Sequence, residues 1–310
     1  MPRVFHLVPA VIAATIICSN PVRAKEPRVF VGASAWAMNY AEDSCQLTRD
    51  FAYGDEIITL SLERFQPSDT VEMALASSEL RRAPREFTTK FQFAPGAVQF
   101  EARQFQGELE DGRDYFGIGP VRLGIAAVSF GDADEFQQAA TTLYRRADEL
   151  EAARKLEGLM VTEGFTKDFT LDLGPMVPPI QAMQACMDEL LTHWGVDVER
   201  HRTLTRPAVP AEDPQTWVTP ADFPVDERQR RRGGFNTVRL LLDAAGKPTS
   251  CQVQRAGADS FNSAACRILM EKGKFEPALD AAGQPMPSYF VANFRFQLFT
   301  APAGSARRLR

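Results

Sequence analysis

Residues 236–253 read NTVRLLLDAAGKPTSCQV, which is the pattern of a β-hairpin. Alternate residues within 236–242 share one face of the first strand, because successive side chains of a strand point to opposite faces. The turn DAAGK follows, and its Gly246 can take the positive φ angle that tight turns need. Cys251 and Val253 then share a face of the returning strand. The segment therefore predicts two antiparallel strands joined by a short turn.

A helix and a third strand are predicted after the hairpin. Ser260 is expected to cap the start of the helix, and Gly273 lies near its end. The apolar residues between them follow the i, i+3, i+4, i+7 pattern of a helix with one apolar face; they are Phe261, Ala264, Ala265, Ile268 and Leu269. Residues 289–298 alternate between apolar and polar, as in a strand with one buried side. The last quarter of the chain is thus predicted to form a small α+β module.

This module resembles the C-terminal domain of the TonB family over residues 223–299. The family typically has an aromatic-Pro pair, a hairpin ending in Asp-x-x-Gly, a Leu-Asp-x-Ala-Ala-like helix start, a Phe-x-Pro-Ala stretch and a Gly-x-Pro. The corresponding segments are Phe223-Pro224, Gly234 to Gly246, Phe261-Asn262-Ser263-Ala264-Ala265, Phe275-Glu276-Pro277-Ala278 and Gly283-Gln284-Pro285. The chain departs from the family at Asn262, where Asp is usual, and in carrying Cys251 and Cys266.

The resemblance implies a mode of partner binding. In the TonB family, the domain is thought to accept the N-terminal box of an outer-membrane transporter as an added strand near its last strand, and an exposed sheet edge permits this. The implied surface is Ser288 to Gln297, and the candidate partner-binding residues are Tyr289, Asn293, Arg295 and Gln297. Two alternatives remain open at this stage. The edge could be covered by the first domain, or by a second copy in a homodimer, which would make the module structural.

The N-terminus has the pattern of a secretory signal peptide. Arg3 supplies the positive charge, Val4–Cys18 is mostly apolar, and Val22-Arg23-Ala24 fits a cleavage site after Ala24. Residues 1–24 are therefore expected to be removed, which leaves an exported, periplasmic chain with no spanning helix. The alternative is an uncleaved N-terminus that anchors the chain in the inner membrane. TonB energy transducers use such a helix together with a long arm, so cleavage would leave a binding module without force transduction.

Composition bounds the remaining possibilities. The chain has 310 residues, enough for two domains, and a formal net charge of -5. Removal of Arg3 and Arg23 with the signal peptide would bring the charge to -7. A chain this acidic is not expected to bind nucleic acid.

Four cysteines remain after the signal peptide, and they allow three pairings. The favoured pairs are Cys251–Cys266 and Cys45–Cys186, one bridge in each domain, because an oxidising compartment favours disulfides over free thiols. The Cys251–Cys266 bridge would close a loop of about 15 residues and stabilise the module by roughly 3 kcal/mol in the loop-entropy model.

Residues 25–205 are predicted to form a larger α+β domain with a mostly antiparallel sheet and two helices. Strand-like patterns occur at 57–62, 71–75, 87–93, 98–105, 121–130 and 169–173. Helical periodicity covers 132–158 and 180–195. Gly117 and Gly119 are interpreted as a turn before the strand at 121–130, because no glycine-rich loop leads from them into a helix.

Three further segments complete the domain organisation. Residues 206–222 are rich in proline and are predicted to form a semi-rigid extended linker. The arginine-rich run at 228–232 is interpreted as a solvated loop, with contact to an acidic partner or anionic polymer as the alternative. Residues 300–310 are predicted to be a flexible tail.

No catalytic set, metal site or cofactor site is evident. His193 and His201 could each act as a base, but neither lies near a nucleophile motif, and there is no zinc or calcium motif. The favoured function is binding of a protein or peptide in the cell envelope by strand addition, linked to TonB-dependent transport. The alternatives are a structural or assembly protein and an unrecognised periplasmic hydrolase.

Overall fold

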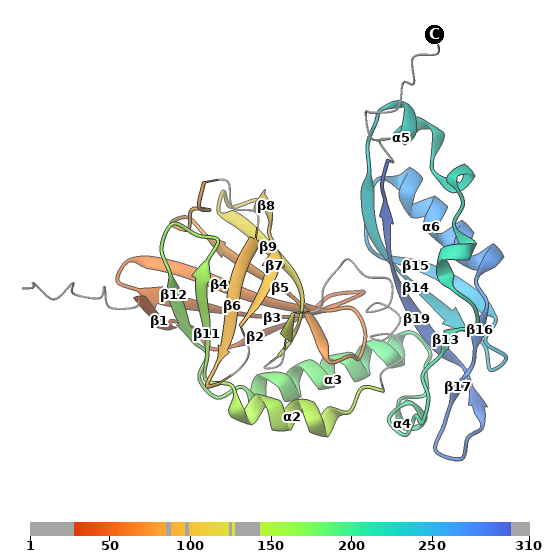
Figure 1. The fold of residues 1–310 in the computed structure, drawn as a ribbon. Coiled ribbons are helices and arrows are strands. Elements are labelled where there is room, and N and C mark those ends of the chain that lie inside the picture. Colours follow the sequence, from red (N-terminus) through yellow and green to blue (C-terminus); the bar gives the residue numbers. More distant parts are fainter. Residues whose placement is uncertain (1–27, 85–87, 97–98, 124–125, 128–142, 299–310) are drawn as a thin grey trace, which may run out of the picture.

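The computed structural model describes residues 28–84, 88–96, 99–123, 126–127 and 143–298. The predicted signal peptide and C-terminal tail lie outside these ranges. Figure 1 shows a β-rich first body with two helices at one end, and a second body in which a helix covers a small sheet. The protein therefore has the α+β architecture that the sequence predicts.

The first body is built on one 12-stranded sheet. Its strands are β1 (Arg28–Gly32), β2 (Ala37–Tyr40), β3 (Cys45–Tyr53), β4 (Glu56–Arg64), β5 (Thr70–Ser77), β6 (Thr88–Ala94), β7 (Phe100–Arg103), β8 (Phe105–Glu108), β9 (Asp114–Arg122), β10 (Ala126–Ala127), β11 (Gly158–Glu163) and β12 (Phe169–Asp172). The main path runs β10-β9-β5-β4-β3-β1-β12-β11-β6-β7, with β2 beside β3 and β8 beside β9. All pairs are antiparallel except β1 with β12. Since β7 lies against β9 and β10, the sheet curls towards a barrel.

Aromatic side chains fill the inside of this curled sheet. Alternate residues of β3, β4 and β6 are buried, as expected for strands with one face on the core. The most buried rings belong to Phe30, Phe51, Phe91, Phe116 and Phe169. Helix α3 (Val177–His193) packs against β2 and β3, and α2 (Arg146–Lys155) packs against α3. The methionines at 176, 183 and 187 are buried in this core.

Two predictions for the first domain were wrong in detail. Gly117 and Gly119 do not form a turn; they lie within β9, where the register with β5 shifts. Gly119 has a φ of 96° there, which glycine tolerates and which a bulge exploits. Of the helix expected over 132–158, residues 132–142 lie outside the described ranges. In the remaining part, α2 covers Arg146–Lys155, whereas 143–145 are not helical and Gly158 begins β11.

The second body has the order predicted from the sequence. Its sheet runs β15-β14-β19, with β14 (Gly234–Leu242), β15 (Pro248–Arg255) and β19 (Ser288–Phe296) all antiparallel. Helix α6 (Asp259–Lys272) covers one face. Shorter elements are α5 (Val225–Gln229), β16 (Phe275–Glu276), β17 (Ala278–Leu279) and β18 (Pro285–Met286). Gly246 takes a φ of 80° in the hairpin turn, as expected.

The buried face of the sheet follows the predicted alternation. Val238, Leu240 and Leu242 of β14 share a core with the helix and with alternate residues of β19, which are Phe290, Ala292 and Phe296. The start of α6 differs from the prediction. Ala258 is the N-cap, and Ser260 lies in the first turn, where its hydroxyl donates to Glu227 at 3.2 Å.

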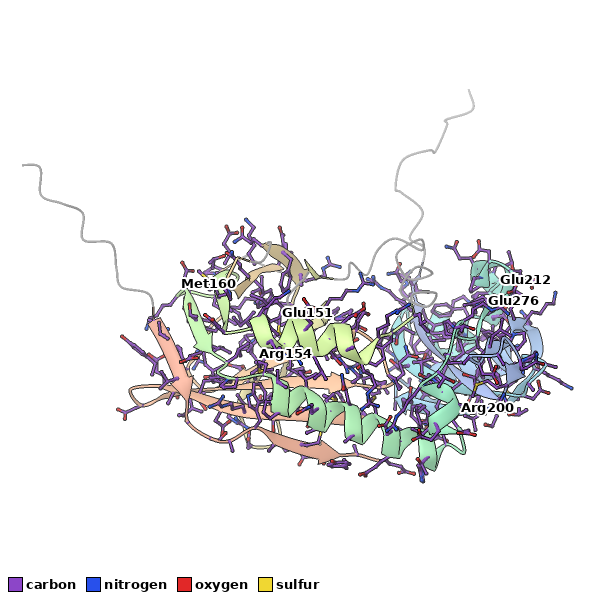
Figure 2. All side chains as sticks on the ribbon, turned by 90° about the horizontal axis from the view of Figure 1, so that it is seen from below. Glu151, Arg154, Met160, Arg200, Glu212 and Glu276 are labelled. Atoms are coloured by element: carbon purple, nitrogen blue, oxygen red, sulfur yellow. A yellow bond between two sulfur atoms is a disulfide. The ribbon has the colours of Figure 1, made fainter. Side chains whose placement is uncertain are left out.

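The proline-rich segment 206–222 does not form the extended spacer expected from its composition. It contains β13 (Val209–Pro210), which pairs with β16, and two short 3-10 helices, η1 (Pro214–Trp217) and η2 (Pro220–Asp222). Ala208 and Trp217 are buried in the same core as α6. The apolar side chains between the prolines enter this core, so the segment folds against the domain. Val209 pairs with Glu276, and Glu212 accepts a hydrogen bond of 3.2 Å from Lys274; Figure 2 labels both glutamates on the second body.

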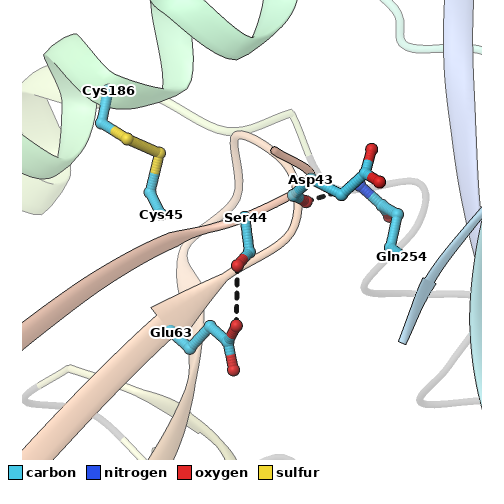
Figure 3. The surroundings of a disulfide bond; sticks show 6 residues. All are labelled: Asp43, Ser44, Cys45, Glu63, Cys186 and Gln254. Carbon is cyan, nitrogen blue, oxygen red and sulfur yellow. Dashed lines mark hydrogen bonds between the residues drawn. A yellow bond between two sulfur atoms is a disulfide. The ribbon is translucent and has the colours of Figure 1, made fainter. Parts of the chain in front are cut away.

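Both predicted disulfides are present. Cys45 of β3 is bonded to Cys186 of α3, with their Cα atoms 6.1 Å apart (Figure 3). Cys251 of β15 is bonded to Cys266 of α6, with a Cα separation of 5.6 Å. Each bridge joins a strand to the helix that covers it, so each fixes one layer of a domain to the next.

Candidate functional site

The last strand of the second body forms an edge of its sheet. Within the described residues, β14 is the strand that pairs with β19, and it does so along all of Ser288–Phe296. The other side of β19 has no strand partner among those residues. Its backbone N–H and C=O groups on that side are of the kind that an extended peptide can pair with.

The sheet face opposite α6 is covered by the first domain. Arg239 of β14 donates to Asp43 at 2.8 Å and stacks over the ring of Trp194 at 4.2 Å. Gln254 of β15 donates to the backbone oxygens of Asp43 and Phe65, at 3.0 and 2.9 Å. Figure 3 shows Gln254 reaching the loop at Asp43, next to the first disulfide. These contacts involve β14 and β15 on the face of the sheet, and they do not involve the backbone of β19.

A second group of charges lies at the same interface. Arg255 of β15 lies 3.9 Å from Glu63 and 3.8 Å from Glu72, two residues on neighbouring strands of the first domain. Burial raises the pKa of Glu72, while Arg255 opposes that shift. The interface is thus held by charged groups from both bodies, and nothing in the sequence placed these residues together.

The four candidate partner-binding residues lie in two different environments. Tyr289 is buried; its ring contacts Trp194 at 5.3 Å and His201 at 5.4 Å, and burial raises its pKa. Asn293 is half-buried and accepts a hydrogen bond of 2.7 Å from Thr237. Tyr289 and Asn293 therefore belong to the covered face.

Arg295 and Gln297 are exposed at the far end of β19, away from the first domain. The side-chain amide of Gln297 lies within hydrogen-bonding distance of the Arg295 guanidinium. These two residues remain accessible to a partner that lies along the edge.

A groove runs beside the first half of the β19 edge. Its volume is about 630 Å³. One wall is β19 from Ser288 to Val291, and the opposite wall comes from α3. The remaining lining is supplied by residues between the end of α4 (Val198–His201) and Ala208, by the loop at 66–69, and by residues 143–148, which include the first turn of α2. The free edge thus opens into a hollow built by both bodies.

An ion-pair network fixes the α3 wall of this groove. Arg146 and Arg202 both donate to Asp188, at 2.7 and 2.6 Å. Burial alone would raise the pKa of Asp188, but the hydrogen bonds from the two arginines lower it. Asp188 is therefore ionised at neutral pH.

His201 is the one histidine in the groove lining, and it is neutral at neutral pH. Burial lowers its pKa to about 4, and the charge of Asp188 opposes that shift only in part. A neutral imidazole stacked on Tyr289 extends the apolar floor of the groove. His193, by contrast, is exposed at the end of α3.

Two features of the described residues bear on metal binding and on membrane spanning. In the ranges that the structure describes, no group of three His, Cys, Asp or Glu residues is placed to hold a metal ion. Nor does any helix of the described chain have the length and apolar character needed to cross a membrane.

Taken together, a three-stranded sheet, a helix on one face and a last strand with one side unpaired among the described residues define a small α+β module. Residues 219–298 match the family model described as Gram-negative bacterial TonB protein C-terminal. The match begins at Thr219, the N-cap of η2, and ends two residues after β19. It covers about a quarter of the chain and confirms the predicted resemblance. No curated protein and no solved structure matched the chain.

The TonB-like domain and the two disulfides are features of an envelope protein linked to transport. Sequence reasoning missed the interdomain residues Asp43, Trp194 and Arg239. Asp43 and Arg239 are separated by 196 positions, and neither lies in a motif that signals a contact. The groove was missed for the same reason, because its walls come from five separate parts of the chain.

Proposed function

We propose that this protein is an exported, periplasmic binding module that accepts an extended segment of a partner protein as an additional strand along β19. The observation that carries the proposal is the unpaired edge of Ser288–Phe296, which opens into the groove. The TonB-like match favours an N-terminal segment of an outer-membrane transporter as the partner. Main-chain hydrogen bonds would supply affinity, and the groove would select side chains.

Two parts of the site would have different roles in such a complex. The groove beside Ser288 to Val291 would receive the side chains at one end of the added strand. Arg295 and Gln297 would contact the other end, where they are exposed. Tyr289 would act indirectly, by holding β19 against Trp194 of the first domain, and Asn293 by fixing β19 to Thr237 of β14.

The proposal is tested by titrating the isotope-labelled mature chain with transporter N-terminal peptides and following backbone amide shifts. We expect the largest shifts at residues 288–297 and a Kd in the micromolar to millimolar range. A matched peptide with proline at alternate positions should not bind, because proline cannot donate to the strand ladder. Absence of shifts along β19 at millimolar peptide, or equal binding of the proline peptide, would sink the proposal.

A second candidate function is structural, and the interdomain contact favours it. The first domain already covers the face of the TonB-like sheet through Arg239, Gln254 and Arg255. In that case the second domain serves mainly as part of an assembly, which includes the homodimer alternative. Peptide-independent pairing of two β19 edges, detected as a dimer by light scattering, would favour this candidate.

The periplasmic location depends on cleavage after Ala24. Mass measurement of the mature protein tests it. A mass that includes Met1, recovered with the membrane fraction, would favour an anchored chain instead.

A further inference from the structure

An arginine cluster occupies the end of the second domain that is distant from the interdomain groove. We call it the arginine pole; its members are Arg228, Arg230, Arg231, Arg232 and Arg295. All five are exposed. They come together because α5 and the turn after it lie beside the C-terminal end of β19, where Gly234 pairs with Phe296 (Figure 1).

The arginine pole belongs to the basic part of an otherwise acidic protein. Residues 223–310 contain fourteen Arg and Lys residues against seven Asp and Glu residues, a net charge of +7. The whole chain is at -5, so residues 1–222 carry -12. Such a separation of charge within one molecule favours an oriented approach to an anionic surface.

The arginines of the pole are only partly neutralised. The buried carboxylate of Glu227 lies 3.0 Å from Arg232 and 3.7 Å from Arg230. Among the described residues, Arg228 and Arg231 have no side-chain hydrogen bond or ion pair. The nearby exposed acids are Asp226 on α5 and Asp259 at the start of α6. Five arginines against three acids leave the pole positive.

The backbone conformation of Arg231 is a second indication that the side chains of the pole have a function. Helix α5 ends in a Schellman motif: the N–H of Arg231 donates to Arg228 at 3.1 Å, and that of Arg232 to Glu227 at 2.9 Å. This motif places Arg231 at a φ of 54°, where glycine is usual. It is the one non-glycine residue with a positive φ in the described part of the chain. A guanidinium held at a position that favours glycine points to a role for its side chain.

We propose that the arginine pole docks the second domain onto an anionic lipid surface. Guanidinium groups bind phosphates in a bidentate manner, and clustered arginines add their attraction to an anionic leaflet. The arginines of the pole are exposed on α5, on the turn after it and near the end of β19, and they line neither the groove beside β19 nor the hollow near Trp36. An exposed cluster outside these two hollows fits a flat surface better than it fits an extended peptide. Val225, 56% exposed on the same helix, supplies an apolar contact at headgroup depth.

The test is co-sedimentation of the full mature chain with two kinds of vesicle. One kind is phosphatidylcholine alone, and the other contains phosphatidylcholine and phosphatidylglycerol in equal parts. We expect binding to the anionic vesicles only, and we expect added salt to weaken it, because surface charges are screened. The double variant Arg228→Ser/Arg231→Gly should weaken partitioning about 25-fold, since each basic residue near the surface contributes about fivefold.

Two controls keep this test separate from folding and from total charge. Arg231→Gly alone should raise Tm while weakening partitioning about fivefold, because glycine relieves the left-handed position. The double variant Arg154→Ser/Lys167→Ser removes the same charge from exposed positions of the first domain and should partition like the wild type. Figure 2 shows Arg154 on α2, well apart from the second domain.

Three outcomes would overturn the proposal. The first is equal binding of the wild type to both kinds of vesicle. The second is unchanged partitioning of the Arg228→Ser/Arg231→Gly variant. The third is binding of soluble polyglutamate, reduced by the same two substitutions, without any binding to vesicles. That result would assign the pole to an acidic protein partner.

Discussion

Asp222 links the start of the TonB-like domain to its helix α6. Its carboxylate is buried and accepts hydrogen bonds from the backbone and hydroxyl of Thr219, at 2.9 and 2.7 Å. Arg267 and Lys272 of α6 donate to it at 3.2 and 2.7 Å. It therefore joins the proline-rich segment to the helix of the TonB-like domain. Burial alone would raise its pKa, but these hydrogen bonds and charges lower it strongly.

We expect Asp222→Asn to lower the free energy of unfolding by about 2–3 kcal/mol at neutral pH, because hydrogen bonds to a buried charge are lost. The pKa of Asp222 is lower in the folded state than in the unfolded state. Its contribution is therefore complete above about pH 4 and declines as the pH falls below that value. Urea denaturation of both proteins at several pH values measures this difference.

Asp226→Asn is the matched control for that experiment, because Asp226 is exposed on α5. It should change stability by less than about 0.5 kcal/mol. A gap between wild type and Asp222→Asn that stays constant from pH 7 down to pH 2 would contradict the proposed role of the carboxylate.

Cysteine and glycine positions were the residues best predicted from the sequence. Cys251 and Cys266 could be paired because a strand and the helix after it were recognisable on either side of about 15 residues. Gly246 was correctly placed because one turn required it. Gly119 was misread because a bulge inside a long strand leaves the same local signature as a turn.

At the scale of elements, the two disulfides act on loops of very different length. Cys251–Cys266 spans 15 positions, between β15 and α6, and Cys45–Cys186 spans 141 positions, between β3 and α3. In the loop-entropy model, the longer loop loses more freedom when it is closed. The Cys45–Cys186 bridge is therefore expected to contribute more to stability than the Cys251–Cys266 bridge.

We expect Cys45→Ser/Cys186→Ser to lower the free energy of unfolding by about 5 kcal/mol, and Cys251→Ser/Cys266→Ser by about 3 kcal/mol. Guanidinium denaturation of the two double variants measures both values. The order of the two losses is the useful readout, since strain or residual structure changes their absolute size. A larger loss for the 251/266 pair would count against loop length as the cause.

The elements with strong periodicity were predicted well, and those that depend on distant partners were not. Helix α3 and strand β19 carry long regular patterns, so their positions were confirmed within a few residues. The proline-rich segment was misjudged because composition indicates an extended backbone but cannot show what that backbone packs against. Only the pairing of β13 with β16, 65 positions later, reveals that.

At the scale of the whole molecule, the main finding is that the two bodies are in direct contact. Arg239 is central, since it is 8% exposed and contacts both Asp43 and Trp194. Tyr289 and Val291 of β19 belong to the hydrophobic core of the first domain rather than to that of their own. Unfolding of one body should therefore be coupled to unfolding of the other.

We expect Arg239→Ala to weaken this coupling by about 2 kcal/mol, because it removes a hydrogen-bonded ion pair with Asp43. Differential scanning calorimetry should show one transition for the wild type and two for the variant. Arg154→Ala, at an exposed position of α2, should retain the single transition. Two transitions already present in the wild type would show that the interdomain contact is too weak to couple the bodies.

The contact between the two bodies could not be predicted from the sequence. The open edge of β19 followed from the order of strands, which the sequence signals supported. The covered face did not, because it depends on a loop near residue 43 meeting a strand that lies almost 200 positions away. The strand of the candidate site could therefore be predicted from the sequence, but the groove beside it could not.

The folded state of residues 205–211 also determines what the molecule can reach. The backbone N–H groups of Thr205 and Arg206 donate to Leu279, and that of Ala211 donates to Lys274. The segment after α4 is therefore fixed to the second body and leaves only a short connection between the two bodies. Together with the ion pair between Arg239 and Asp43, this short join favours one orientation of β19 relative to the first domain. A partner strand that paired with β19 would then extend from the protein in one defined direction.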